Sequence, residues 1–348
     1  MLAVGQPEPS RYIRTTGMLS ARAVLKFADL SRIRFFSARE ADELAEQVRK
    51  RNVFARHSWE NNFYLQRVKA LADHTVIEVF RQGDPKDIGE KTEQVATTLE
   101  RITVLSSSIA LDRSQLQRKL GISARPGSET NFMISPGYRF LRSRARPAPV
   151  AQGVLIDERF CKRFSRCSFN TLPDYMQSRT DIAKRVSRSL DWLFDSRTEP
   201  RLEAAVVKTS IALESLLIFS ESESLAQSLS ERAAFVLSSN PDRRHLISRT
   251  LKRFYEARSG VVHGSQKKAK KLNPTLLETI DRLAILLCLI IAANSRLWHS
   301  ADALREWCEG QRWGDPSKEV QIPFPGSYLR NAIALSQDEL EPATAGAG

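Results

Sequence analysis

The sequence predicts an all-α protein, with a C-terminal helical bundle preceded by an N-terminal helical domain and a basic, irregular linker region. Three observations support this. Apolar residues recur at helical spacing over long stretches, beginning near Ser37 and resuming after Asp181. Helix-start signals stand before several of these stretches, as in Asn273-Pro274. The chain has 348 residues and 42% hydrophobic residues, which is enough for two domains, or for one domain with an extension.

The N-terminal part divides into a loose tail, residues 1–20, and a predicted helical domain, residues 21–121. Ser37 followed by Glu40 matches a capping box, so the first helix is expected to begin there. Two further apolar patterns predict helices at residues 57–82 and 89–121.

Residues 122–180 have a different character, because Pro and Gly recur and the helical period is lost. This predicts a linker, or an irregular layer with short strands. The region is also strongly basic, with aromatic residues interleaved, and Arg142, Arg144 and Arg146 are candidate nucleic-acid contacts. Such a composition suits single-stranded nucleic acid, but it is more typical of a solvated linker whose aromatic residues dock on the core.

Helical patterns resume over residues 181–308, followed by a tail at residues 309–348. Turn signals such as Asn240-Pro241-Asp242, with Asp242 as the expected cap, separate the helices. The helix at 201–220 is apolar nearly all round, so we expect it at the centre of the bundle. Five helices are predicted, at residues 181–195, 201–220, 223–238, 242–262 and 274–308.

Three of these helices carry a charged residue on an apolar stripe, namely Glu214, Arg232 and Arg258. A charge in such a position needs a partner or a ligand, because burying it alone is costly. We expect Glu214 to pair with Arg232, which leaves Arg258 facing a cleft. The alternative is that all three charges are structural, or lie at the surface.

These residues also carry a family resemblance. The segments at residues 212–217, 230–234 and 255–264 resemble the Apea-like branch of the HEPN superfamily in order and spacing, and the resemblance covers about residues 185–305. It implies a helical bundle that dimerises, and many members are metal-independent ribonucleases of toxin and antiphage systems. Others bind nucleotides or partners without cutting.

The family's active site is an Arg followed, after four to six residues, by a His, often with a polar residue after the Arg. The resemblance maps it onto Arg258, Ser259 and His263, and the motif support onto Glu214, Arg232, Tyr255 and Gly264. A guanidinium matches phosphate oxygens, and a histidine transfers protons near neutral pH.

Helix geometry adds a constraint to this assignment. Five residues along a regular helix rotate by roughly 140°, so Arg258 and His263 do not share a helix face. We expect Gly260 or Gly264 to distort or end the helix. One histidine also cannot readily act as both acid and base, and the resemblance implies that a dimer brings two motifs together.

The net charge of +13 favours a polyanionic partner, and RNA fits the motif. Four lysines directly after the motif would raise the local affinity for phosphate, although an ordinary solvated loop is also typical there: Lys267, Lys268, Lys270 and Lys271. The four cysteines have no metal-ligand spacing, so we expect no metal and no other cofactor. The absence of a signal peptide and of a long apolar run predicts a cytoplasmic protein that does not enter a membrane.

The sequence therefore favours a metal-independent RNA endonuclease, acting as a homodimer in defence or as a toxin. The alternative is a non-catalytic dimerisation or nucleic-acid-binding module. In either case the N-terminal half is a candidate sensor, or a domain that recruits a regulatory protein partner.

Overall fold

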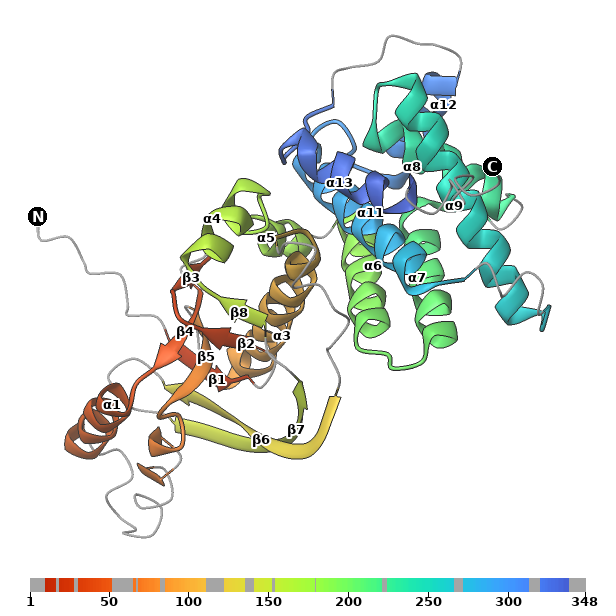
Figure 1. The fold of residues 1–348 in the computed structure, drawn as a ribbon. Helices are drawn as coiled ribbons and strands as arrows, with labels where there is room; N and C mark the ends of the chain where they lie inside the picture. The colour runs from red at the N-terminus through yellow and green to blue at the C-terminus, as the bar shows by residue number, and fades with distance from the viewer. Residues whose placement is uncertain are drawn as a thin grey trace, which may run out of the picture. The chain divides into compact units, whose positions relative to one another are not determined.

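The structure, a computed structural model, forms two compact units (Figure 1). The N-terminal unit comprises Met1–Ser107 and Arg113–Phe164, and the C-terminal unit comprises Ser108–Asp112 and Ser165–Gly348. The chain is mostly helical, but the N-terminal unit contains an antiparallel sheet. The structure describes residues 10–16, 19–27, 31–51, 65–66, 68–81, 85–110, 122–134, 141–151, 154–178, 180–220, 224–265, 272–312 and 320–337.

The sheet of the N-terminal unit corrects the expectation of an all-α chain with a helical domain at residues 21–121. Its six strands run in the order β3-β4-β5-β1-β6-β7, and β2 and β8 form a separate parallel pair. The strands are β1 (Ser10–Thr15), β2 (Leu19–Ala21), β3 (Leu25–Lys26), β4 (Arg32–Phe36), β5 (His74–Arg81), β6 (Ile122–Ile134), β7 (Leu141–Ala151) and β8 (Val154–Ile156).

Strand β5 shows why the helix predicted at residues 57–82 is wrong at its C-terminal end. Ile77 and Phe80 are three residues apart, which also fits a helix. However, β5 is rich in β-branched residues, which favour a strand that is half-buried or fully buried. It lies between β4 and β1, and its consecutive residues Thr75–Val79 are all buried.

Two helices pack on opposite faces of the sheet. Helix α1 (Ala38–Arg51) covers one face through a core that includes Ile13 and Phe36. Ser37 and Glu40 form the predicted capping box at its start: the backbone N–H of Ser37 donates to Glu40 Oε2 at 3.0 Å, and that of Glu40 to Ser37 Oγ at 3.3 Å. Helix α3 (Pro85–Ala110) lies on the other face, where Arg14 pairs with Glu100 at 2.7 Å.

A buried carboxylate, Glu78 of β5, gathers three arginines from the neighbouring strands. Arg11 Nε donates to Glu78 Oε1 at 3.1 Å and Arg34 Nε to Oε2 at 2.8 Å, and Arg32 also pairs with Oε2. Burial alone would raise the pKa of Glu78, but the hydrogen bonds and charges of Arg34 and Arg11 outweigh it and lower the pKa to about 2. The four groups join three strands of the sheet.

The predicted basic linker at residues 122–180 is largely ordered secondary structure. Strands β6 and β7 pair along most of their length, and β7 is an edge strand of the sheet. Arg142, Arg144 and Arg146 occupy alternate positions on β7, so an edge strand, rather than a loop, carries these candidate contacts. Helices α4 (Glu158–Arg166) and α5 (Leu172–Gln177) complete the region, and the chain passes into the C-terminal unit within α4.

All the regular secondary structure in the described residues of the C-terminal unit is helical. The predicted helices at 181–195 and 242–262 are confirmed, and those at 201–220 and 223–238 are present over shorter ranges. Asn240, rather than Asp242, caps the helix predicted at 242–262, because its side-chain Oδ1 accepts a hydrogen bond from the backbone N–H of Arg243. The predicted helix at 274–308 is two helices, and the expected tail holds a further one. The helices are α6 (Asp181–Arg197), α7 (Leu202–Leu217), α8 (Leu225–Leu237), α9 (Pro241–Val262), α11 (Pro274–Ala293), α12 (Ala301–Arg312) and α13 (Gly326–Gln337).

Helix α11, rather than α7, is the centre of the C-terminal unit. It contacts α5, α6, α7, α8, α9 and α13 (Figure 1), and every residue from Thr279 to Ile291 is buried. Polar side chains inside this core bond one another: Thr209 of α7 donates to Asp281 of α11 at 2.8 Å and lies 2.8 Å from Ser196 of α6. These hydrogen bonds join α6 and α7 to α11. Helix α7 also packs against α9.

Candidate functional site

Four polar residues at the contact of α7 and α9 form the candidate site. Ser210 and Glu214 are four residues apart on α7, and Tyr255 and Arg258 are three apart on α9, so each pair shares one helix face. Arg258 Nη2 lies 3.7 Å from Glu214 Oε1, and Arg258 Nε donates to Ser210 Oγ at 3.3 Å. The phenol oxygen of Tyr255 lies 3.3 Å from both Glu214 Oε1 and the Ser210 carbonyl oxygen, so these two acceptors share its single O–H donor. We call these residues the α7–α9 cluster.

The cluster corrects the expected Glu214–Arg232 pair, because Glu214 is paired with Arg258. Arg232 instead donates to the carbonyl of Leu217 at 2.7 Å, at the C-terminal end of α7. A guanidinium is favourable there because the last carbonyls of a helix lack intrahelical partners. Arg232 therefore stabilises the end of α7 rather than neutralising Glu214.

The side chains of Arg258 and Glu214 are 23% and 22% exposed, so solvent or a ligand can reach both. Tyr255 is buried, and burial together with the neighbouring Glu214 carboxylate raises the pKa of its phenol above the ordinary value. Tyr255 is thus a neutral hydrogen-bond donor and no candidate for a general base. Its role is to hold Glu214, which in turn holds Arg258.

His263 lies apart from this cluster, at the end of α9. It is the C-cap residue and is exposed, and its backbone N–H donates to the Ser259 carbonyl at 3.0 Å. Ser265 N donates to the Gly260 carbonyl at 2.8 Å around Gly264, whose φ is +70°. This 6→1 bond is that of a Schellman motif, so Gly264 ends the helix as predicted, while Gly260 remains helical within α9.

Because α9 is regular up to Val262, Arg258 and His263 face different directions, and within the described residues no hydrogen bond or ion pair joins them. The structure thus places Arg258 in the α7–α9 cluster, Ser259 beside the helix cap, and His263 in solvent. Lys267, Lys268, Lys270 and Lys271 lie outside the described residues, as do the side chains of Arg142, Arg144 and Arg146.

Replacing Gly264 by alanine is expected to destabilise the C-terminal unit by about 1 kcal/mol, because an L side chain is strained at positive φ. Urea unfolding of the wild type and of the Gly264→Ala variant measures this difference in unfolding free energy. Gly326→Ala is the matched control, because a Cβ there also meets open space but no positive φ strains it. Equal effects of the two substitutions would contradict the assigned cap.

A basic pocket of 630 Å³ adjoins the α7–α9 cluster, and Glu214 belongs to its lining. Helix α6 contributes Lys184, Arg185 and Arg188 to it from one helix face. Arg185 donates to the carbonyls of Ser215 and Ile218 at 3.0 and 2.9 Å, beside the end of α7. The side chains of Lys184 and Arg188 are exposed and make no hydrogen bond or ion pair in the part of the chain that the structure describes.

These three cations were not predicted from the sequence. Their spacing along α6 was the available signal, since residues three and four apart on a helix are neighbours. The pocket supplies cations for an anionic ligand beside Glu214, the residue that pairs with Arg258.

Two wider properties bear on the chemistry. The described residues contain no group of three or more His, Cys, Asp or Glu side chains that could hold a metal ion. Among the described helices, none has the length and apolar character needed to cross a bilayer.

In comparisons with known proteins, no family model, curated protein or solved structure matches this chain.

Proposed function

We propose that the C-terminal unit is a metal-independent RNA endonuclease of the HEPN type, in which Arg258 and His263 are the reacting groups. The observation that carries the proposal is the exposed His263 at the end of α9, five residues after a half-buried Arg258 beside a basic pocket. The resemblance to the HEPN superfamily also suggests that this activity serves in defence or as a toxin.

The reaction needs a base, a cation and an acid. The base takes the proton from a 2′-hydroxyl, and that oxygen then attacks the adjacent phosphorus. The P–O5′ bond breaks, giving a 2′,3′-cyclic phosphate and a 5′-hydroxyl that takes a proton from the acid. Arg258 stabilises the charge on the phosphate oxygens, and the His263 side chains of two protomers serve as base and acid.

The direct test is incubation of the purified protein with RNA in the presence of a chelator. We expect fragments that end in a 2′,3′-cyclic phosphate, and a homodimer in light scattering at the concentration of the assay. Intact RNA with a folded dimer would remove the support for cleavage.

Mixing the wild type with excess His263→Ala protein tests whether two protomers share one site. Heterodimers hold a single His263, so we expect the wild-type activity to fall as the variant is added. Activity that depends only on the amount of wild type would show that each protomer acts alone.

One observation favours a second candidate, a module that binds RNA without cutting it. Glu214 already pairs with Arg258, which reduces the charge that this arginine offers to phosphate. Such a module would retain labelled RNA in a gel-shift assay and leave it intact. Replacing Lys184 and Arg188 by glutamine would weaken that retention, whereas His263→Ala would not.

A further inference from the structure

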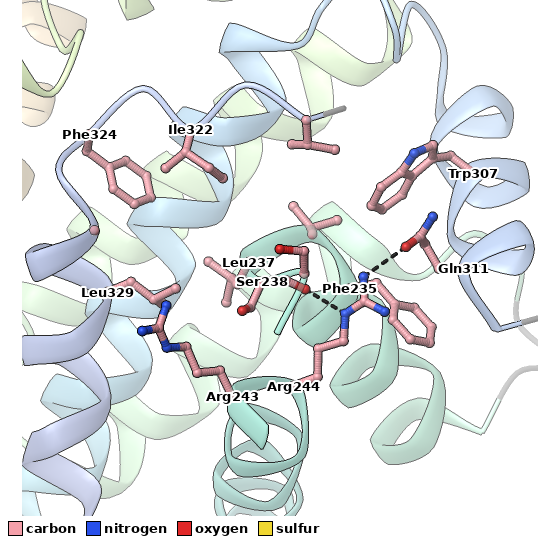
Figure 2. Close-up of a pocket in the computed structure, with 14 residues that line it drawn as sticks. Phe235, Leu237, Ser238, Arg243, Arg244, Trp307, Gln311, Ile322, Phe324 and Leu329 are labelled. Atoms are coloured by element: carbon pink, nitrogen blue, oxygen red, sulfur yellow. Dashed lines mark hydrogen bonds between the residues drawn. The ribbon is translucent and has the colours of Figure 1, made fainter. Parts of the chain in front are cut away.

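A second pocket of the C-terminal unit, 490 Å³ in volume, lies beside the N-terminal end of α9 (Figure 2). Arg243 and Arg244 reach it from α9 and Gln311 from α12. Ile322 and Phe324, which precede α13, line the pocket across from Arg244, and Leu329 of α13 is drawn next to Arg243. The pocket therefore has two cations and, across from Arg244, an apolar side.

Arg244 is a half-buried cation that is bonded only to neutral groups. Its Nε donates to the Ser238 carbonyl at 2.6 Å and its Nη2 to Gln311 Oε1 at 2.8 Å, and its Cζ lies 5.0 Å from the centre of the Phe235 ring (Figure 2). No described carboxylate forms an ion pair with it. Burial accordingly lowers the pKa of Arg244, and a charge in this situation is stabilised by an anion.

Arg243 supplies a second cation to the same pocket. It is exposed, and its guanidinium makes no hydrogen bond or ion pair within the described ranges. The residues that line the pocket include no Asp or Glu, so its two positive charges are not offset there. This distinguishes it from the pocket beside α6, which Asp181 and Glu214 also line.

The apolar side determines what kind of anion fits. Ile322 is 43% exposed, so a ligand that covers it removes apolar surface from water, whereas Phe324 and Leu329 are buried and form the wall beside it. A free inorganic anion would leave this side uncovered. The volume falls within the range of about 300–1,000 Å³ that is usual for small-molecule sites.

We propose that this pocket binds a small amphipathic anion, whose carboxylate or phosphate group contacts Arg243 and Arg244 and whose apolar body covers the exposed side chain of Ile322. The site is separate from the proposed RNA site. Arg244 and Arg258 are fourteen positions apart on α9, which corresponds to about 21 Å along the helix axis. The two proposals can therefore fail independently.

Isothermal titration of the full-length chain tests the proposal with three probes. Octanoate carries a carboxylate on an alkyl chain, adenosine 5′-monophosphate carries a phosphate on an aromatic body, and 1-octanol has the alkyl chain without the charge. We expect octanoate or the nucleotide to bind and 1-octanol to bind at least about tenfold more weakly, because it lacks the charge-assisted hydrogen bonds. The anion that binds identifies the ligand class.

Arg243→Gln is the deciding variant, because Arg243 is exposed and its side chain bonds no described residue, so the change does not threaten folding. We expect it to weaken binding of the anion about tenfold. Arg249→Gln, an exposed arginine of α9 outside the pocket, should bind as the wild type does. Failure of both anions to bind the wild type, or equal binding by Arg243→Gln, would overturn the proposal.

Discussion

Replacing His263 by alanine is expected to lower the rate of the proposed RNA cleavage by about 10²–10⁴-fold, the usual contribution of a positioned acid or base. Because His263 is an exposed C-cap whose backbone makes the helix bond, the unfolding free energy should change by less than about 0.5 kcal/mol. Initial rates on a labelled RNA, together with thermal unfolding, measure both quantities.

His245→Ala is the matched control for this experiment, since His245 is an exposed histidine near the other end of α9. It should cut RNA at the wild-type rate. Arg258→Lys is a companion variant that keeps the charge and loses the planar fork of donors, and we expect it to lower the rate about 10²-fold. A His263→Ala protein as active as the wild type would show that the reacting group lies elsewhere.

Replacing Glu78 by glutamine is expected to destabilise the N-terminal unit by about 3 kcal/mol, because three guanidinium groups then lose their shared buried carboxylate. For a unit of this size, the melting temperature should fall by about 6–12 °C. Differential scanning calorimetry measures the shift, and the transition that moves belongs to the N-terminal unit. Glu43→Gln is the control, because the Arg39–Glu43 pair is exposed and such pairs contribute little to stability.

The contribution of Glu78 should also depend on pH. Its pKa is about 2 in the folded chain against 4.5 for a free side chain, so between these pH values only the unfolded chain binds the proton. The stabilisation is therefore complete above about pH 4.5 and is lost as the pH falls toward 2. Calorimetry at pH 6 and pH 3 should show a smaller difference between wild type and Glu78→Gln at the lower pH; an unchanged difference would contradict this assignment.

The sequence predicted the helices whose starting signals are local. The Ser37–Glu40 box and the Asn273 cap depend on residues within one turn, and both are present, with Asn273 accepting from Leu276 N at 2.7 Å. Strand β5 was misassigned because a short apolar run fits both periods, and its pairing with β1 and β4 is not a local property. Helix α11 was not recognised as the centre because Asp281 and Arg282 interrupt its apolar pattern, although both are buried.

The candidate site was predictable in part. The apolar stripe predicted that Arg258 needs an anionic partner or a ligand, but it assigned Glu214 to Arg232, whereas the structure pairs Glu214 with Arg258. The choice between Arg232 and Arg258 as the partner depends on how α7 packs against α8 and α9, which the spacing within each helix does not determine. The sequence left Gly260 and Gly264 as alternative points at which the helix is distorted or ends, because glycine after an apolar pattern is a stop signal, and the structure selects Gly264.

The burial of α11 on all sides has a consequence for hydrogen exchange. Its amides are covered by five other helices of the bundle and by α5, so they meet solvent only when the C-terminal unit opens as a whole. The amides around His263, at a solvent-exposed helix end, can open by local fraying. Deuterium uptake in α11 therefore measures the global stability of this unit. Comparing the uptake of the amides around His263 with that of α11 then measures how freely the end of α9 moves in the native state.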